Sequence, residues 1–303
     1  MKIIEKEYKH PEYLVETEWL EQHLEEPSLR VFDCTVNVTL NPDTVQRQKI
    51  PFVYTSGITT FDQAHVPRAG YINVASELSD SSSDLPLMLP SEEHVLEMMR
   101  SYGISDDSHV VLYSTTEANW ATRVWWMLRS FGFNNVSILN GGWPKWSSEG
   151  RPVSKQACEY IPGKLSLQLR ANAFVDKYQV LDAIDKDVVR IINALPSGMY
   201  NGSSEFVFGR KGRITNSVNV PFVSLHDVDT GRYLPADQLR KKFDEVNTEN
   251  AKQIITYCGG GVAASNAAFA LALLGYENVS VYDGSMLEWG NDASLPMEMN
   301  NDL

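Results

Sequence analysis

Short apolar runs alternate with amphipathic stretches along the chain. The runs LRVFDCTV (29–36) and VVRIINAL (188–195) have the length of strands. The stretches SEEHVLEMMRSYG (91–103) and AASNAAFALALLG (263–275) show the i, i+3, i+4 apolar spacing of helices, and each ends at a glycine that can take the left-handed position after a helix. Strands that alternate with helices predict a mainly parallel sheet with helices on both faces, so the expected fold class is α/β.

The chain also repeats itself. The segment 113–146 aligns with 257–289 when one extra residue is allowed in the first loop. The positions that match include Leu128, Gly132, Asn135, Val136, Ser137, Gly141 and Trp146, paired with Leu271, Gly275, Asn278, Val279, Ser280, Gly284 and Trp289. The period is about 143 residues, close to half of the 303-residue chain, which predicts two tandem domains of the same α/β type.

A polar segment lies between the two repeats. In SSEGRPVSKQACEYIPGK (147–164), proline and glycine interrupt the chain and the apolar periodicity lapses. We expect an N-terminal domain over residues 1–150, a linker over 151–170 and a C-terminal domain over 171–303.

Charge and cysteine content narrow the possible functions. A net charge of −13 disfavours nucleic acid and anionic membrane surfaces as partners, because both repel an acidic protein. The sequence has no run of about 18 apolar residues to span a bilayer, and its charged first residues do not resemble a secretory signal. Its three cysteines, Cys34, Cys158 and Cys258, form neither a disulfide framework nor a zinc-binding spacing. We therefore expect a reducing, cytoplasmic setting and no metal or cofactor.

One cysteine stands where chemistry is expected. The strand QIITY (253–257) is followed by Cys258, by three glycines (259–261) and by a helix that begins near Ala263. Ligands of open parallel sheets bind where loops leave the carboxyl ends of the strands. Successive glycine N–H groups can converge on an anion, and the helix N-terminus adds partial positive charge. The sequence therefore predicts a lowered pKa for Cys258 and a loop that stabilises negative charge on its sulfur.

The first repeat provides an internal comparison. Ser114 takes the place of Cys258 there, and Thr115-Thr116-Glu117 replaces the glycines. Any cysteine chemistry therefore belongs to the C-terminal domain.

Three other interpretations compete with this one. The cysteine could be a buried structural residue before a flexible turn, since free cysteines are often buried. A cysteine-based phosphatase or arsenate reductase also places Cys before a helix, but its Cys-x5-Arg loop needs an arginine where this chain has Ala264, which disfavours that activity. A non-enzymatic sulfur carrier or binding module remains open.

The sequence resembles the two-domain rhodanese-type sulfurtransferases, which include the thiosulfate and 3-mercaptopyruvate sulfurtransferases. The resemblance covers nearly the whole chain, and its motifs are SDLPLMLPSEE (83–93), ATRVWWMLRSFG (121–132), LNGGWPKW (139–146), CGGGVA (258–263) and VSVYDGSMLEW (279–289).

This resemblance implies a persulfide mechanism between two domains. Cys258 would take sulfur from a small anionic donor and pass it to a nucleophilic acceptor, such as thioredoxin or a low-molecular-weight thiol. The first domain would be inactive and would help to wall the site. The loop residues that would bind substrate are Gly259, Gly260, Gly261, Val262 and Ala263.

The basic cluster FGRKGR (208–213) occupies the place where the family has a second substrate-binding arginine. By resemblance, Arg210 and Arg213 would form the anion clamp, because a guanidinium fork suits a carboxylate or thiosulfonate. Arg123 is interpreted instead as a residue of the domain interface or of a structural ion pair.

Several specificity groups of the family are replaced in this chain. The third loop position, basic in thiosulfate enzymes and Ser or Thr in mercaptopyruvate enzymes, is Gly260. Other replaced positions are Leu87 for a histidine, Ala75 near an expected acidic residue, Met199 for a substrate arginine and Arg68 for a glycine. Without a basic loop residue, we expect mercaptopyruvate or another organic thiol donor to be preferred slightly over thiosulfate.

Overall fold

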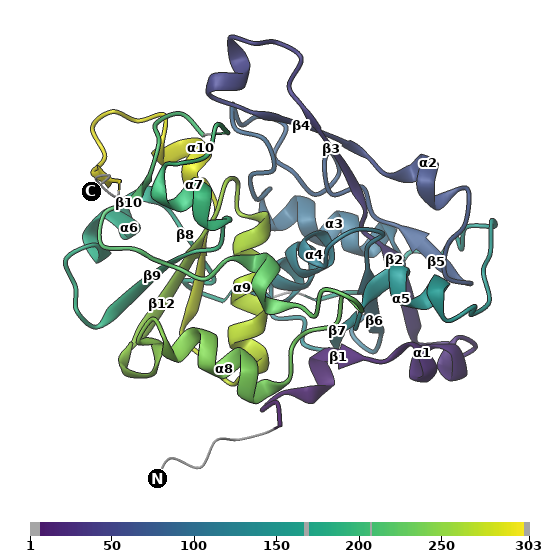
Figure 1. The fold of residues 1–303 in the computed structure, drawn as a ribbon. Helices are drawn as coiled ribbons and strands as arrows, with labels where there is room; N and C mark the ends of the chain where they lie inside the picture. Colours follow the sequence, from purple (N-terminus) through teal and green to yellow (C-terminus); the bar gives the residue numbers. More distant parts are fainter. Residues whose placement is uncertain (1–6, 167–169, 207, 300–303) are drawn as a thin grey trace.

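The computed structural model describes residues 7–166, 170–206 and 208–299, and it contains two five-stranded sheets side by side (Figure 1). Within these ranges, all neighbouring strands of both sheets are parallel, so the α/β expectation with mainly parallel sheets is confirmed. Residues 1–6, 167–169 and 300–303 of the expected domains and linker lie outside the described residues, as does Val207.

The first sheet has the order β1-β7-β6-β2-β5 and the second has the order β11-β9-β12-β13-β8. The strands of the first are β1 Leu14–Val15, β2 Leu29–Asp33, β5 Ala69–Tyr71, β6 His109–Tyr113 and β7 Val136–Leu139. Those of the second are β8 Phe174–Val175, β9 Val189–Asn193, β11 Val218–Asn219, β12 Gln253–Tyr257 and β13 Val279–Tyr282. When the second sheet is read from its other end, equivalent strands of the two halves follow one another in the same order. The sequence repeat is therefore also a repeat of the sheet topology.

Two short antiparallel ladders accompany the sheets. They are formed by β3 Val36–Leu40 with β4 Phe52–Ser56, and by β10 Arg213–Ile214 with β14 Met297–Glu298. The α-helices are α1 Thr17–His23, α2 Ile58–Phe61, α3 Glu92–Ser101, α4 Asn119–Ser130, α5 Gly142–Ser148, α6 Lys177–Ala183, α7 Ser197–Asn201, α8 Ala236–Asp244, α9 Val262–Leu273 and α10 Ser285–Trp289. Short 3-10 helices cover Pro11–Tyr13, Gln46–Gln48, Phe222–Leu225 and Thr248–Asn250.

Both predicted strands end earlier than their apolar runs because of the same turn. In the first half, Asp33 Oδ1 accepts the Thr35 N–H at 2.8 Å, and the run 29–36 divides into β2 and β3. In the second half, Asn193 Oδ1 accepts the Leu195 N–H at 2.7 Å, and β9 ends. A short side chain that bonds two residues ahead turns the backbone away from the sheet.

The first sheet has helices on both faces, as expected. Val31 and Phe32 are neighbours in β2, and their side chains enter two different apolar clusters because alternate residues of a strand point to opposite faces. One cluster includes Leu20 of α1 and Trp146 of α5, and the other includes residues of α3 and α4.

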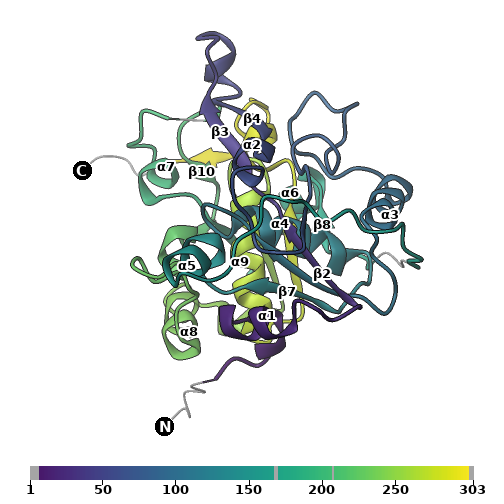
Figure 2. The same ribbon diagram turned by 90° about the vertical axis from the view of Figure 1, so that its right-hand side faces the viewer.

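Helices α4 and α9 pack against each other between the two sheets, and both views place them side by side (Figures 1 and 2). Trp125 of α4 meets Phe269 of α9 edge to face, with 4.8 Å between ring centroids. Asn266 of α9 donates to Asn119 Oδ1 of α4 at 2.7 Å. The interface is thus a continuous part of the core, and loops at the ends of both sheets face the opposite half of the chain.

No helix of the described chain is long and apolar enough to cross a membrane.

Candidate active site

Cys258 follows β12 directly, at the carboxyl edge of the second sheet, as the sequence predicts. All but the first residue of β12 are buried, which fixes the strand and the start of the loop. The loop ends at Gly261, which precedes α9 with φ of 76°. Only 2% of Cys258 is exposed, so the thiol lies beneath the surface in this conformation.

The glycines of the loop have different roles. Gly261 has a positive φ, and a Cβ there would lie 2.8 Å from Asp283 Oδ1, so both conformation and space require glycine. A Cβ on Gly259 would overlap the Phe208 ring. Gly260 is not left-handed, and its Cβ would meet the flexible end of Leu287 at 2.8 Å. The close approach of side chains to this loop therefore depends most on Gly259 and Gly261.

Ser285 holds the loop closed from the other side. Its hydroxyl accepts the N–H of Cys258 at 3.0 Å and that of Gly261 at 3.1 Å, and it donates to the Tyr282 carbonyl at 2.7 Å. The residue is buried and has φ of 47°, a conformation that non-glycine residues rarely adopt. Ser285 was not among the site residues predicted from sequence, although it lies in the motif VSVYDGSMLEW.

A comparison of the two repeats could have revealed this serine. Gly141 aligns with Gly284, so the next position pairs Gly142 with Ser285. Gly142 also has a positive φ, 55°. A serine at a position where the other half uses glycine indicates that its hydroxyl has a purpose beyond packing.

Burial raises the pKa of the Cys258 thiol above its ordinary value, so the prediction of a lowered pKa is wrong for this conformation. The predicted cradle is nonetheless present: the backbone N–H groups of Gly260, Ala263 and Ala264 and the Ser285 hydroxyl all act to lower the pKa. Loss of water around the sulfur outweighs these hydrogen bonds. Val262 and Ala263 form the first turn of α9, and each is 9% exposed.

A hairpin of the first half covers the loop. Strands β3 and β4 extend toward the second half, where Gln48 accepts the Gly209 N–H at 3.0 Å and Lys49 accepts the Asn291 amide at 3.2 Å (Figure 1). Phe52 of β4 packs against Phe208, with 6.0 Å between ring centroids. Phe208 in turn lies against the cysteine loop.

Tyr54 of β4 is the neighbouring aromatic residue of this cover. Its ring meets Trp120 of α4 edge to face, with 6.0 Å between centroids. Burial raises the pKa of Tyr54, and the charge of the Cys258 thiolate raises it further. Tyr54 therefore stays neutral and belongs to the surroundings of the sulfur.

The bidentate clamp predicted for Arg210 is not available in this conformation, because its guanidinium holds the backbone of the C-terminal segment. Nε donates to the carbonyl of Gly290 at 3.2 Å, and Nη2 donates to those of Trp289, Asp292 and Leu295 at 3.0, 2.6 and 3.0 Å. Nη1 is the remaining guanidinium nitrogen that could meet an anion.

Arg213 is also engaged. Its Nε donates to Glu298 at 2.9 Å, and its guanidinium lies 4.6 Å from the centre of the Tyr200 ring. The pair joins β10 to β14, so a structural role of Arg213 accounts for its place in the basic cluster.

Known proteins are similar to this chain over most of its length. A family model described as the rhodanese-like domain matches residues 16–149 and 176–292. The chain belongs to the rhodanese-like family. It is 33% identical over 288 residues to the 3-mercaptopyruvate sulfurtransferase of Escherichia coli, covering 94% of this chain and 98% of that protein. It is 33% identical over 285 residues to the thiosulfate sulfurtransferase of Rattus norvegicus, covering 91% of each.

The fold is similar as well. The crystal structure of SseA from Escherichia coli aligns with a TM-score of 0.75 and 31% identity, covering 90% of this chain and 98% of that one. This rhodanese-like chain is accordingly a sulfurtransferase.

The replaced family positions lie in different surroundings. Leu87 is buried, with φ of 66°, and contributes its carbonyl rather than a histidine ring. Met199 of α7 is half-buried against the core. Arg68 has φ of 64° where the family usually has glycine, and it pairs with Glu25 at 2.8 Å.

The matching loop of the first rhodanese-like half has a different shape. The Ser114 hydroxyl donates to the Glu117 carbonyl at 2.6 Å, which closes the turn on itself. A cavity of about 350 Å³ adjoins this loop, lined largely by apolar groups from both halves, including Phe222 and Tyr233.

The remaining cysteines occupy different surroundings. Cys34 is fully buried, and burial raises the pKa of its thiol well above the ordinary value. Cys158 is partly exposed and its N–H bonds to the Ala69 carbonyl at 2.9 Å. Among the described residues, no three His, Cys, Asp or Glu side chains are grouped so as to hold a metal ion.

Proposed function

We propose that Cys258 carries sulfur as a persulfide between a small anionic donor and a thiol acceptor. The observation that carries this proposal is the position of Cys258 at the carboxyl edge of a parallel sheet, where the Gly260 N–H of the loop, two N–H groups of the first turn of α9 and Ser285 all act to lower the pKa of its thiol. The Cys258 thiolate would attack the terminal sulfur of the donor, forming an S–S bond. With mercaptopyruvate, the S–C bond breaks, and its electron pair stays on the carbon, which then takes up a proton.

The two halves would have unequal roles. We assign the catalytic domain to residues 171–303 and an inactive domain to residues 1–150, joined by the linker 151–170. Ser114 cannot accept a sulfane sulfur in the way a thiolate does, and Glu117 adds negative charge beside it. The first domain would instead supply the hairpin cover of Cys258.

The donor follows from the charges near the sulfur. Arg210 and Arg213 are largely engaged with protein groups, and Gly260 adds no cation. A dianion such as thiosulfate would have the loop N–H groups as its main compensation, whereas a mercaptopyruvate monoanion needs less. We therefore propose mercaptopyruvate or a related organic thiol as the better donor.

For the acceptor we propose thioredoxin or a low-molecular-weight thiol, in a reducing compartment such as the cytoplasm. All three cysteines are unpaired in the structure, and such thiols persist where the surroundings are reducing.

The test is single-turnover sulfur loading, read as intact-protein and peptide mass. Incubation with mercaptopyruvate should add about 32 Da to the peptide that contains Cys258, and Cys258→Ser should abolish both loading and turnover. Cys34→Ser and Cys158→Ser are matched controls that should retain both activities. Sulfur found mainly on Cys34 or Cys158 would refute the proposal, while loading without catalytic turnover would favour a carrier.

Thiosulfate in the same assay tests the donor. The assignment to mercaptopyruvate fails if thiosulfate gives a kcat/KM about tenfold higher or more.

A further inference from the structure

A buried ion pair crosses from the first half of the molecule to the second. Arg123 of α4 is 0% exposed and Asp283, directly after β13, has an 8% exposed side chain. Their Nη1 and Oδ1 atoms lie 2.5 Å apart. Arg123 Nη2 donates to the Leu87 carbonyl at 2.7 Å, and Asp283 Oδ2 accepts the Leu89 N–H at 2.6 Å. The pair therefore ties α4, the segment around Leu87 and the end of β13 together.

This ion pair touches the cysteine loop. A Cβ built on Gly261 would lie 2.8 Å from Asp283 Oδ1 and 3.1 Å from Arg123 Nη1. The two charged groups thus pack directly on the backbone that leads from Cys258 into α9. Arg123 Nε is buried and donates to no described residue.

The repeat shows which side chains occupy the equivalent positions beside the other loop. The offset that aligns the halves pairs Arg123 with Asn266 and Asp283 with Asn140. Asn140 Oδ1 accepts the Tyr233 N–H at 3.0 Å, as Asp283 accepts that of Leu89. Asn266 Oδ1 accepts the Tyr233 hydroxyl at 2.7 Å.

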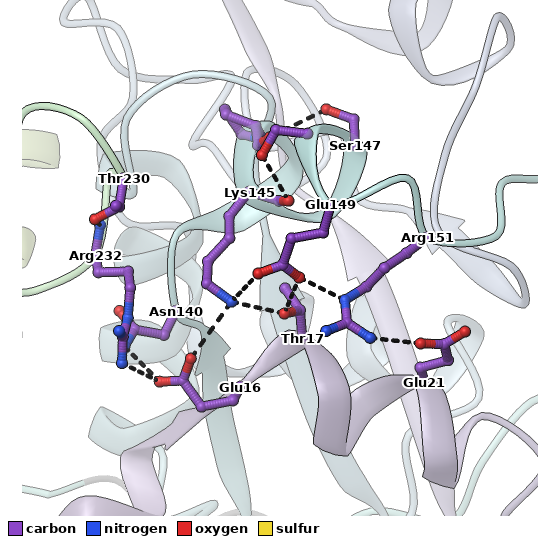
Figure 3. A network of polar contacts seen from close by, with 12 residues as sticks. Glu16, Thr17, Glu21, Asn140, Lys145, Ser147, Glu149, Arg151, Thr230 and Arg232 are labelled. Atoms are coloured by element: carbon purple, nitrogen blue, oxygen red, sulfur yellow. Dashed lines mark hydrogen bonds and ion pairs between the residues drawn. The ribbon is translucent and has the colours of Figure 1, made fainter.

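Figure 3 shows the surroundings of Asn140, where its amide nitrogen donates to Glu16 at 2.7 Å and Arg232 also reaches Glu16. Arg232 belongs to the second half and Glu16 to the first, so an ion pair crosses here too, but its side chains are 46% and 45% exposed, whereas Asn140 is buried. Two amides therefore support the interface beside the Ser114 loop, and two charges support it beside the Cys258 loop.

The buried ion pair is expected to stabilise the fold less than neutral side chains at the same positions would. Removing two ions from water carries a desolvation penalty that their attraction does not always offset, so neutral replacements of similar shape are often harmless. Since neutral side chains occupy the equivalent buried positions beside the Ser114 loop, the buried charges beside Cys258 call for a different explanation.

We propose that Arg123 and Asp283 are positioning residues for sulfur transfer. They hold the cysteine loop against the first domain and set the charge that the Cys258 sulfur experiences, with the guanidinium offsetting the Asp283 carboxylate. This inference rests on the proposed function of Cys258. Tyr54, the ionisable side chain of the hairpin cover, stays neutral and does not replace either charge.

Neutralising either partner of the ion pair should shift the pH midpoint of Cys258 alkylation, and the two shifts should have opposite directions. Arg123→Gln leaves the Asp283 carboxylate unopposed, which disfavours the thiolate and should move the midpoint of Cys258 alkylation up by about half a pH unit or more. Asp283→Asn leaves the guanidinium unopposed and should move the midpoint down by a similar amount. A merely structural role would move both midpoints in the same direction or neither.

Sulfur loading tests the positioning itself. In Arg123→Asn/Asp283→Asn, which copies the two amides beside the Ser114 loop, we expect loading to slow about tenfold or more with a melting temperature within a few degrees of wild type. Arg123→Lys keeps the charge but not both contacts, so kcat should fall with little change in KM. Arg151→Gln, which breaks the ion pairs with Glu21 and Glu149, is the control (Figure 3).

The proposal is overturned if Arg123→Lys and the double variant load sulfur at the wild-type rate, or if the two single variants shift alkylation in the same direction or not at all. If the double variant does not fold, Arg123→Lys and the single variants decide. Failure of wild type to load Cys258 would instead contradict the proposed function, and the alkylation midpoints, which need no sulfur donor, would still test the effect of the charges.

Discussion

Ser285 combines a strained backbone with a fully used hydroxyl. With φ of 47°, it occupies a region that costs a non-glycine residue about 1–3 kcal/mol. Its oxygen satisfies two buried N–H groups of the loop, and leaving such groups unpaired costs about 1–3 kcal/mol each. The hydrogen bonds thus explain why strain is retained at this position.

Substitution of Ser285 separates these two effects. Ser285→Gly and Ser285→Ala should both slow sulfur loading and raise the midpoint of Cys258 alkylation, because Ser285 holds the N–H groups of Cys258 and Gly261 and acts to lower the Cys258 pKa. The glycine variant should melt higher than the alanine variant, since glycine accepts the positive φ without strain. Equal melting temperatures with unchanged loading would contradict the assigned role.

Two adjacent glycines provide a second residue-scale test. Gly261→Ala should reduce sulfur loading about tenfold or more, because its Cβ would press on Asp283 and its φ of 76° is unfavourable for alanine. Gly260→Ala should lose less activity, since its φ is not left-handed and its Cβ would meet one methyl group of Leu287 rather than a charged group or the backbone. Rapid single-turnover mass measurements on both variants make the comparison, and a greater loss at Gly260 would contradict it.

The errors at this scale have a common physical cause. The loop motif CGGGVA was enough to predict where Cys258 lies, but not that Phe208 and the hairpin would bury it and raise its pKa. The basic cluster likewise does not reveal that backbone carbonyls far along the chain occupy Arg210. Burial and hydrogen-bond partners depend on segments distant in sequence, so a local pattern cannot supply them.

At the scale of elements, strand and helix positions were largely predictable. The predicted helices 91–103 and 263–275 correspond to α3 and α9. In α3 the apolar periodicity reflects one buried face, with Val95 and Met99, whereas nearly every residue of α9 is buried. The run 29–36 was not recognised as two strands, since the turn at Asp33 depends on one hydrogen bond from its side chain. The hairpin β3–β4, which covers the site, was not predicted either.

The β3–β4 hairpin leads to a prediction about access to Cys258. Phe52→Ala should expose the cysteine loop by loosening the contact with Phe208, and alkylation of Cys258 by a neutral reagent should accelerate about threefold or more. Val53→Ala changes the next residue of β4, whose side chain points to the opposite face, and should leave the rate unchanged. Peptide mass analysis identifies Cys258 as the alkylated residue, and equal rates in both variants would show that the hairpin does not control access.

The whole molecule is built from one unit used twice, with different results at its two loops. The sequence repeat predicted two tandem domains of the same α/β type, and the identical strand orders of the two sheets confirm it. The aligned repeats show differences in residue type, such as Gly142 against Ser285, but not their structural result: a cavity lies beside Ser114, whereas Cys258 is covered. These differences lie in side chains that share one backbone plan.

This asymmetry predicts that a cysteine alone does not convert the first loop into a catalytic one. Ser114→Cys in a Cys258→Ser background should take up no sulfur from mercaptopyruvate, since Thr115-Thr116-Glu117 provides no glycine cradle and Glu117 disfavours a thiolate. Alkylation of the introduced cysteine by a neutral reagent should still occur through the adjoining cavity, which would show that the thiol is reachable but not activated. Catalytic loading of that cysteine at a rate near that of wild type would mean that the glycine loop, Ser285 and the ion pair are dispensable for sulfur transfer.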